Sequence, residues 1–119
     1  MSNKSGYIDK VKIVDIEYTV EYLDNACDVD IHKRKAVWGQ IDFWTRTIRI
    51  YNNGRPLEDV RQTLLHEILH GLDHHLQLDL DEEKDEERVI DLLATGLNLL
   101  IGSNPELFTT FKQNVVNQK

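Results

Sequence analysis

The sequence predicts an α+β protein, with strands in the first half of the chain and helices in the second. Residues 11–22, 37–43 and 47–51 are rich in β-branched and aromatic side chains, a composition typical of half-buried strands. From residue 56 to about residue 102, apolar side chains recur every three or four positions, as they do on amphipathic helices. Together these observations predict a small three-stranded sheet, antiparallel or mixed, packed against helices.

The composition is typical of a soluble globular domain. The chain has 119 residues, of which 40% are hydrophobic and 29% charged, so we expect one domain over residues 1–119, with residues 1–10 as a flexible N-terminus. The net charge of −7 argues against direct binding to nucleic acid or to a membrane. The first twelve residues contain no apolar signal-peptide core, which predicts a cytoplasmic protein. The single cysteine, Cys27, excludes an intramolecular disulfide.

The first predicted strand covers residues 11–22, where apolar positions alternate loosely. Residues 24–35 then mix Asn, Asp, Lys and Arg with little periodicity, which predicts a surface loop whose apolar anchor is Val29 or Ile31. We therefore expect a connection without regular structure between the first strand and the rest of the sheet.

A hairpin is predicted next, formed by residues 37–43 and 47–51 with residues 44–46 as its turn. Alternate residues of a strand point to the same face of the sheet, so Ile48 and Ile50 should share one face. The residues Asn52, Asn53 and Gly54 end the second run. The two tryptophans of this region, Trp38 and Trp44, could line a groove, but packing in the core is the favoured expectation.

A long helix should begin near Pro56, because proline is favoured in the first turn of a helix and Glu58 and Asp59 suit its positive end. It should continue to about Leu76 with one face in the core. Its apolar residues at helical spacing are Val60, Leu64, Leu65, Ile68, Leu69, Leu72 and Leu76.

Two further helices are expected. Asp79 or Asp81 can cap a second helix that runs to Gly102. Its predicted apolar stripe consists of Ile90, Leu93, Leu97 and Leu100. Residues 104–106, Asn-Pro-Glu, repeat the start pattern of a helix and predict a short C-terminal helix. That helix would bury Leu107, Phe108 and Phe111.

The run His-Glu-Ile-Leu-His at residues 66–70 indicates a metal site. Residues four apart on a helix lie on the same face, so His66 and His70 can direct their imidazoles to one point, which suits zinc. Glu67 points to one side of that pair and can reach a water at the metal, which makes it the predicted general base. Because zinc lowers the pKa of bound water to ~7, the run predicts hydrolysis, most often of a peptide bond.

A catalytic zinc needs a third protein ligand, and the second predicted helix offers two. Glu87 and Asp91 lie four residues apart and share a polar strip beside the apolar stripe. If Glu87 binds the metal, Asp91 can hold the other ring nitrogen of a ligand histidine, and the two roles can also be exchanged. Both residues are therefore metal-ligand candidates.

Other nearby residues are disfavoured as ligands. Glu83 and Glu86 are interpreted as solvated carboxylates near the start of the second helix. His74 lies a further turn beyond His70, and three imidazoles stacked along one helix cannot all reach one ion without distortion. His32 and His75 are interpreted as surface histidines.

The chain resembles small phage- and prophage-encoded HExxH proteins related to the ImmA/IrrE metallo-endopeptidases. The matching segments are residues 64–71, 39–42, 47–50, 89–97 and 104–107. The resemblance implies a minimal zincin, in which a small twisted sheet lies against the active-site helix and a second helix donates an acidic third ligand. In the related glutamate-zincin pattern, Glu is followed four residues later by Asp, as at Glu87 and Asp91.

The predicted function is therefore zinc-dependent peptide hydrolysis with Glu67 as general base. A peptide or protein would be the substrate, bound in extended form along an edge strand of the hairpin, and a regulatory protein could be a second partner. The alternative is a zinc-stabilised, non-catalytic binding or regulatory module of phage or prophage origin. Four protein ligands, including His74 or His75, would favour that alternative, and an open fourth position would favour the enzyme.

Overall fold

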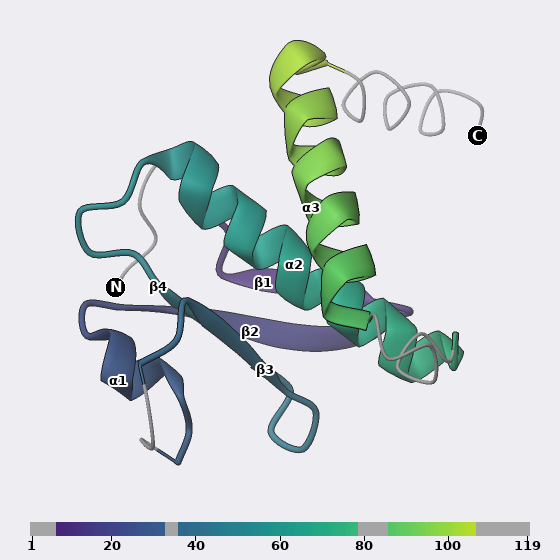
Figure 1. Ribbon diagram of the computed structural model, residues 1–119. Coiled ribbons are helices and arrows are strands. Elements are labelled where there is room, and N and C mark those ends of the chain that lie inside the picture. Colours follow the sequence, from purple (N-terminus) through teal and green to yellow (C-terminus); the bar gives the residue numbers. More distant parts are fainter. Residues whose placement is uncertain (1–6, 33–35, 79–85, 107–119) are drawn as a thin grey trace, which may run out of the picture.

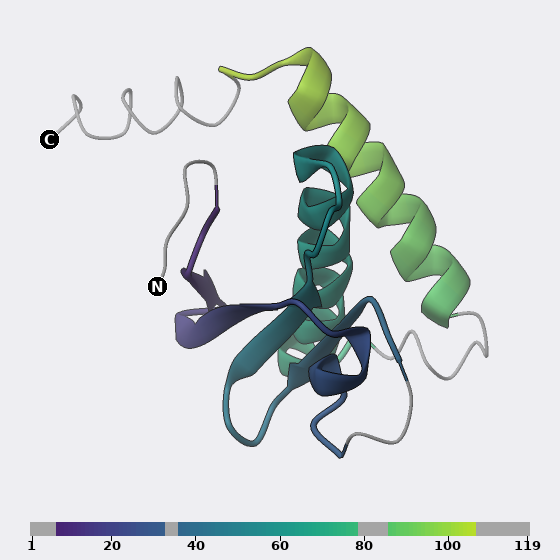
Figure 2. The same ribbon diagram turned by 90° about the vertical axis from the view of Figure 1, so that its left-hand side faces the viewer.

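The computed structural model describes residues 7–32, 36–78 and 86–106, which form an α+β fold in three layers (Figure 1). A four-stranded mixed sheet lies on one side, helix α2 (Leu57–Leu76) crosses its face, and helix α3 (Glu86–Ser103) packs on the far side of α2 (Figure 2). The expected caps Asp79 and Asp81, and the apolar residues of the expected C-terminal helix, lie outside the described residues.

The first predicted strand is in fact two strands, so the expectation of three strands is wrong. Strands β1 (Lys10–Ile13) and β2 (Ile16–Leu23) pair antiparallel, with Ile13 opposite Ile16. Val14 and Asp15 form the turn between them, at φ angles of 52° and 65°. Two-residue hairpin turns need this left-handed backbone, which glycine and asparagine adopt readily but a β-branched valine rarely does. The sequence therefore lacks the residues that normally mark such a turn.

The second hairpin is confirmed. Strand β3 (Gly39–Asp42) pairs antiparallel with β4 (Thr47–Tyr51), and β4 also pairs in parallel with β2. The strand order is β1-β2-β4-β3, so β3 forms an edge of the sheet. Ile48 and Ile50 of β4 are fully buried, as predicted for residues that share the core face.

The predicted loop after the first sheet segment contains one turn of helix, α1 (Ala26–Val29). The Asn25 side chain caps it by accepting a hydrogen bond from the backbone N–H of Cys27. Val29 is the buried anchor, whereas Ile31 is exposed. The helix was missed because one capped turn has no apolar periodicity to detect.

The core lies between the sheet and α2. Its buried residues are Ile13, Tyr18, Val20, Ile48, Ile50, Val60 and Leu64. Helix α2 begins directly after Pro56 and ends at Leu76, and the next residue, Gln77, has a left-handed backbone conformation. Both ends lie within one residue of the prediction. Trp38 and Trp44 are 61% and 94% exposed, so the prediction that they pack in the core is wrong. Among the described residues, no helix combines the length and apolarity needed to span a membrane.

Helix α3 contacts α2 through a face that matches the predicted stripe only in part, since Ile90 is buried and Leu97 half-buried. The buried residues are Ile90, Ala94 and Asn98, whereas Leu93 and Leu100 are about half exposed. The buried Asn98 amide accepts a hydrogen bond from Arg61 of α2. It also donates to the Gln62 side chain and to the backbone carbonyl of Glu58. These hydrogen bonds keep the Asn98 side of α3 against α2. The spacing of apolar residues alone does not predict such a polar contact.

Candidate metal centre

His66 and His70 lie one turn apart on the face of α2 that meets α3. Their Nε2 atoms are 3.2 Å apart, and their ring centroids are separated by 4.9 Å. This convergence follows from the four-residue spacing, which places both side chains on one helix face. Helix α2 is anchored on the sheet next to these histidines, because Leu64 and Val60, two and six residues before His66, are buried in the core.

Glu87, in the first turn of α3, completes the group. Its Oε1 atom lies 3.1 Å from Nε2 of His66, and its Oε2 atom lies 3.1 Å from Nε2 of His70. Among the described residues, these three side chains form a group that could hold a metal ion. Donor atoms bound at 2.0–2.1 Å to a tetrahedral zinc lie roughly 3.3 Å from one another, close to the separations found here.

Asp91 lies on the other side of the His66 ring. Its Oδ1 atom is 3.7 Å from Nδ1 of His66, whereas Nε2 of that ring faces Glu87. Of the two carboxylates that the sequence could not separate, Glu87 therefore lies between the histidines and Asp91 lies behind one of them. A carboxylate in the position of Asp91 orients a ligand imidazole and fixes which nitrogen carries the proton.

Glu86 has the corresponding position behind the second histidine. Its Oε2 atom is 3.1 Å from Nδ1 of His70, and its side chain also hydrogen-bonds with the buried Asp73. Desolvation, together with this bond to Asp73, raises the pKa of Glu86. Its interpretation as a solvated carboxylate is wrong. A sign was present in the sequence, because Glu86 falls in line with the apolar stripe, where a carboxylate needs a partner.

Glu67 is 7% exposed, unusually low for a carboxylate. Burial raises its pKa from 4.5 to about 7, with a smaller contribution from the negative charge of Glu87, while His70 acts in the opposite direction. Gly39 of strand β3 approaches it closely. A Cβ atom at Gly39 would lie 3.1 Å from the Glu67 carboxylate and 2.7 Å from Cγ2 of Thr63. The absent side chain thus lets the edge strand lie directly against the carboxylate.

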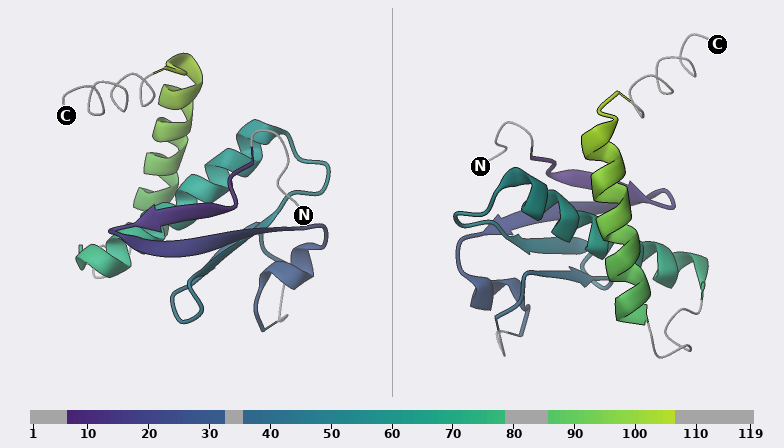
Figure 3. Two further views of the ribbon diagram at one scale, coloured as in Figure 1. Left: turned by 180° about the vertical axis from the view of Figure 1, so that it is seen from behind. Right: turned by 45° about the horizontal axis from the view of Figure 1, so that its top comes forward.

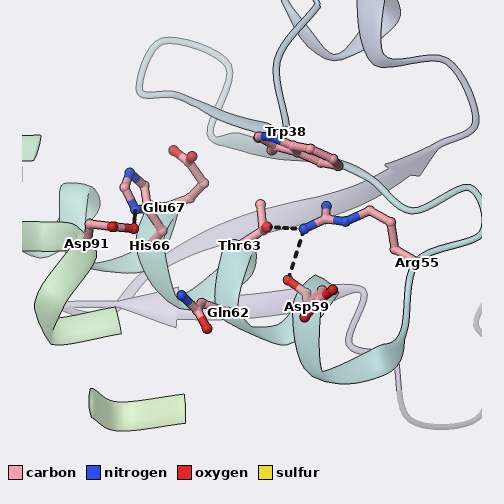
Figure 4. A pocket seen from close by; sticks show the side chains of 9 residues that line it. Trp38, Arg55, Asp59, Gln62, Thr63, His66, Glu67 and Asp91 are labelled. Carbon is pink, nitrogen blue, oxygen red and sulfur yellow. Dashed lines mark hydrogen bonds and ion pairs between the residues drawn. The ribbon is translucent and has the colours of Figure 1, made fainter. Parts of the chain in front are cut away.

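A hollow of about 380 Å³ opens beside Glu67, toward the start of α2 (Figure 4). The guanidinium of Arg55 lies 4.4 Å from the ring centroid of Trp38, which forms a wall of this hollow. Arg55 is itself held by hydrogen bonds to the carbonyls of Tyr51 and Asp59 and to the Thr63 hydroxyl. These contacts hold the Arg55 side chain in place against the Trp38 ring.

A second hollow, of about 720 Å³, lies on the other side of Glu67 and contains His70, Glu86 and Glu87. His66 and Glu67 line both hollows and therefore lie between them.

No protein-family model, curated protein or solved structure matches this chain.

His74 and His75 contact aromatic residues outside the metal-ligand group. The His74 ring stacks on Phe43 with centroids 3.8 Å apart and an interplanar angle of 7°. His75 is partly buried and forms a hydrogen bond with the Tyr18 hydroxyl, so its interpretation as a surface histidine is wrong. His32 is exposed as expected, and Glu83 lies outside the described residues.

Proposed function

We propose that this protein is a zinc-dependent metallopeptidase of the HExxH type, a minimal zincin similar to the ImmA/IrrE metallo-endopeptidases and of phage or prophage origin. One observation carries the proposal: His66, His70 and Glu87 converge next to a buried glutamate, Glu67, in an open hollow. The residues that the HExxH pattern assigns to metal binding and to proton transfer thus lie in one place.

The donor set suits zinc. Two imidazoles and one carboxylate are the ligands of many catalytic zinc sites, and the separations of 3.1–3.2 Å suit a tetrahedral ion. Asp91 and Glu86 stand behind the two imidazoles as second partners, an arrangement typical of zinc histidines. Zinc held here would supply Lewis acidity, lowering the pKa of water and polarising a peptide carbonyl.

Glu67 acts as the general base in this proposal. In the metal-free chain burial raises the pKa of Glu67 to about 7, and a zinc ion held by the neighbouring histidines would lower it, so the carboxylate would be ionised and ready to accept a proton near neutral pH. Glu87 is too exposed for this role and faces the histidines instead.

A peptide or an extended protein segment is the proposed substrate. Strand β3 lies at the edge of the sheet and next to Glu67, so an added strand would run past the carboxylate. The hollow lined by Trp38 and Arg55 is the proposed position for one substrate side chain.

The contacts of His74 and His75 favour catalysis over a purely structural zinc site. A structural site would need a fourth protein ligand. His74 stacks on Phe43 and His75 bonds to Tyr18, so neither joins the group of three. Within the described part of the chain the group has three members, which in this proposal leaves the fourth position for water.

The test compares metal content with peptidase activity. The full chain should carry about one zinc per molecule by mass spectrometry of the metal and should cleave fluorescently labelled casein or a peptide library. Glu67→Gln should keep the zinc and lose the cleavage, whereas Glu58→Gln, an exposed position on the same helix, should keep both. Cleavage by Glu67→Gln at the parent rate would refute the mechanism, and a chain that binds no zinc would refute the proposed function.

A further inference from the structure

Asp73 is a buried carboxylate that the proposed mechanism does not use. It lies in the last turn of α2, three residues after His70, and is 7% exposed. Both features are unfavourable for an acidic residue, because burial disfavours its charge and the C-terminal end of a helix is itself negative. A side chain that breaks two such local rules indicates a functional contact.

Asp73 reaches the metal-ligand group through Glu86 of α3. The side chains of Asp73 and Glu86 are hydrogen-bonded, and such a bond between two carboxyl groups requires a proton on one of them. Oε2 of Glu86 in turn lies 3.1 Å from Nδ1 of His70. The three residues therefore form a chain of contacts that leaves α2 at Asp73, crosses to α3 and returns to α2 at His70.

This contact distinguishes the two candidate ligand histidines. Behind His70, the Glu86 side chain is 26% exposed and is bonded to Asp73 as well as to the imidazole. Behind His66, the Asp91 side chain is 66% exposed and lies 3.7 Å from the ring nitrogen. A long side chain that makes two bonds loses most of its rotamer freedom, so Asp73 fixes the carboxylate that orients His70.

The same contact bears on Glu87, the next residue of α3. Its side chain is 74% exposed, so packing does not fix its direction, and its position depends on the backbone of the first turn. Helix α3 packs on α2 on the side away from the sheet (Figure 3). Its first buried apolar residue, Ile90, comes one turn after Glu86. The contacts of Glu86 with Asp73 and His70 therefore hold the first turn of α3 against α2.

We propose that Asp73 is a positioning residue of the metal centre. It holds Glu86, and through Glu86 it orients His70 and keeps the turn that carries Glu87 close to the histidines. Asp73 is not a member of the group of three that could hold the ion, so it acts without binding the metal. This inference rests on the metal binding of the proposed function and not on peptidase activity.

The first test measures the zinc affinity of the full chain, stripped of metal, by competition with a chromophoric chelator. Asp73→Ala should weaken zinc binding by about 10-fold, the lower end of the loss expected when the direct partner of a ligand histidine is removed. Asp73→Asn should stay within about threefold of the parent, because its amide has nearly the same shape and can donate to Glu86. No loss in Asp73→Ala, or an equal loss in Asp73→Asn, would overturn the proposal.

The comparison does not depend on a single variant. Alanine forms helices better than aspartate, so Asp73→Ala should stay folded by circular dichroism. Asp73→Leu has a shape similar to that of Asp73→Asn but cannot form a hydrogen bond, so it should lose zinc affinity like Asp73→Ala. Parent-like zinc binding by Asp73→Leu would also contradict the assigned role.

A double-mutant cycle tests whether Asp73 acts through Glu86. Glu86→Ala removes the partner of His70 and should weaken zinc binding by roughly 10–100-fold. Adding Asp73→Ala to this variant should change the affinity by less than about twofold, because the contact is already lost. A residue that only supports the fold would lower the affinity by the same factor in both backgrounds. Such additivity would refute the proposal.

Thr95→Val is the matched control. The Thr95 hydroxyl of α3 accepts a hydrogen bond from Gln62 of α2, two turns away from Glu87. Its loss should leave zinc affinity within about twofold of the parent, because distant contacts act independently. An effect as large as that of Asp73→Ala would mean that the general attachment of α3 sets the site. A parent chain that binds no zinc would refute the proposed function as well, whereas zinc binding that is unaffected by Asp73→Ala would refute this inference alone.

Discussion

Replacing Glu67 by glutamine should stabilise the metal-free protein in a pH-dependent way. Burial raises the pKa of Glu67 from 4.5 to about 7, so the folded chain holds this proton more tightly than the unfolded chain. The stability contributed by the neutral carboxyl is complete below about pH 4.5 and is lost as the pH rises to about 7. A difference of about 2.5 pKa units corresponds to roughly 3 kcal/mol. Glutamine has nearly the same shape and cannot ionise.

The expected result is therefore a gain of up to ~3 kcal/mol in the free energy of unfolding of Glu67→Gln at about pH 8, and almost none at about pH 4. The chain would be stripped of metal with a chelator, because a bound cation lowers the pKa of a neighbouring carboxyl. Urea unfolding followed by far-ultraviolet circular dichroism is the suitable assay, since Trp38 and Trp44 are exposed and report poorly on the core.

Glu58→Gln is the control for this experiment. Glu58 is exposed in the first turn of the same helix, so its replacement should change stability little at either pH. The reasoning is refuted if Glu67→Gln has the same effect at both pH values, or if it destabilises the metal-free chain at about pH 8. Either result would mean that the Glu67 carboxylate is solvated or paired in the folded protein.

Three further predictions concern the metal donors and the hollow beside them. Glu87→Gln should weaken zinc binding more than Asp91→Asn, whose effect should stay within roughly 10–100-fold in a chelator competition; the reverse order would contradict the geometry. Gly39→Ala should lower the free energy of unfolding by about 1–3 kcal/mol, because its Cβ would lie 2.7 Å from a side-chain carbon of α2. Gly102→Ala, which has room for its Cβ, is the control in the same urea titration. Trp38→Ala should raise KM for peptides with little change in kcat, and a selective fall in kcat would argue against a substrate-binding role.

Local sequence patterns correctly predicted the helices and strands that depend on the preferences of neighbouring residues. The hairpin of β3 and β4 and the bounds of α2 follow from residue preferences and from Pro56 at the helix start, so the structure confirms them. The turn at Val14 and Asp15 was missed because its backbone is one that valine rarely adopts. The face that α3 turns toward α2 was predicted only in part. Ile90 is buried as expected, but Leu93 and Leu100 are exposed. Asn98, whose hydrogen bonds to α2 have no apolar signature, is buried on the contact face instead.

The sequence by itself determined the centre of the candidate site. His66, Glu67 and His70 share one helix, and helix geometry fixes their relative directions within a single turn. Only the tertiary structure decided which carboxylates meet them, because the crossing of α2 and α3 depends on packing and on bonds between residues about 40 positions apart. That crossing places Glu87 between the two histidines, and Asp91 and Glu86 behind them.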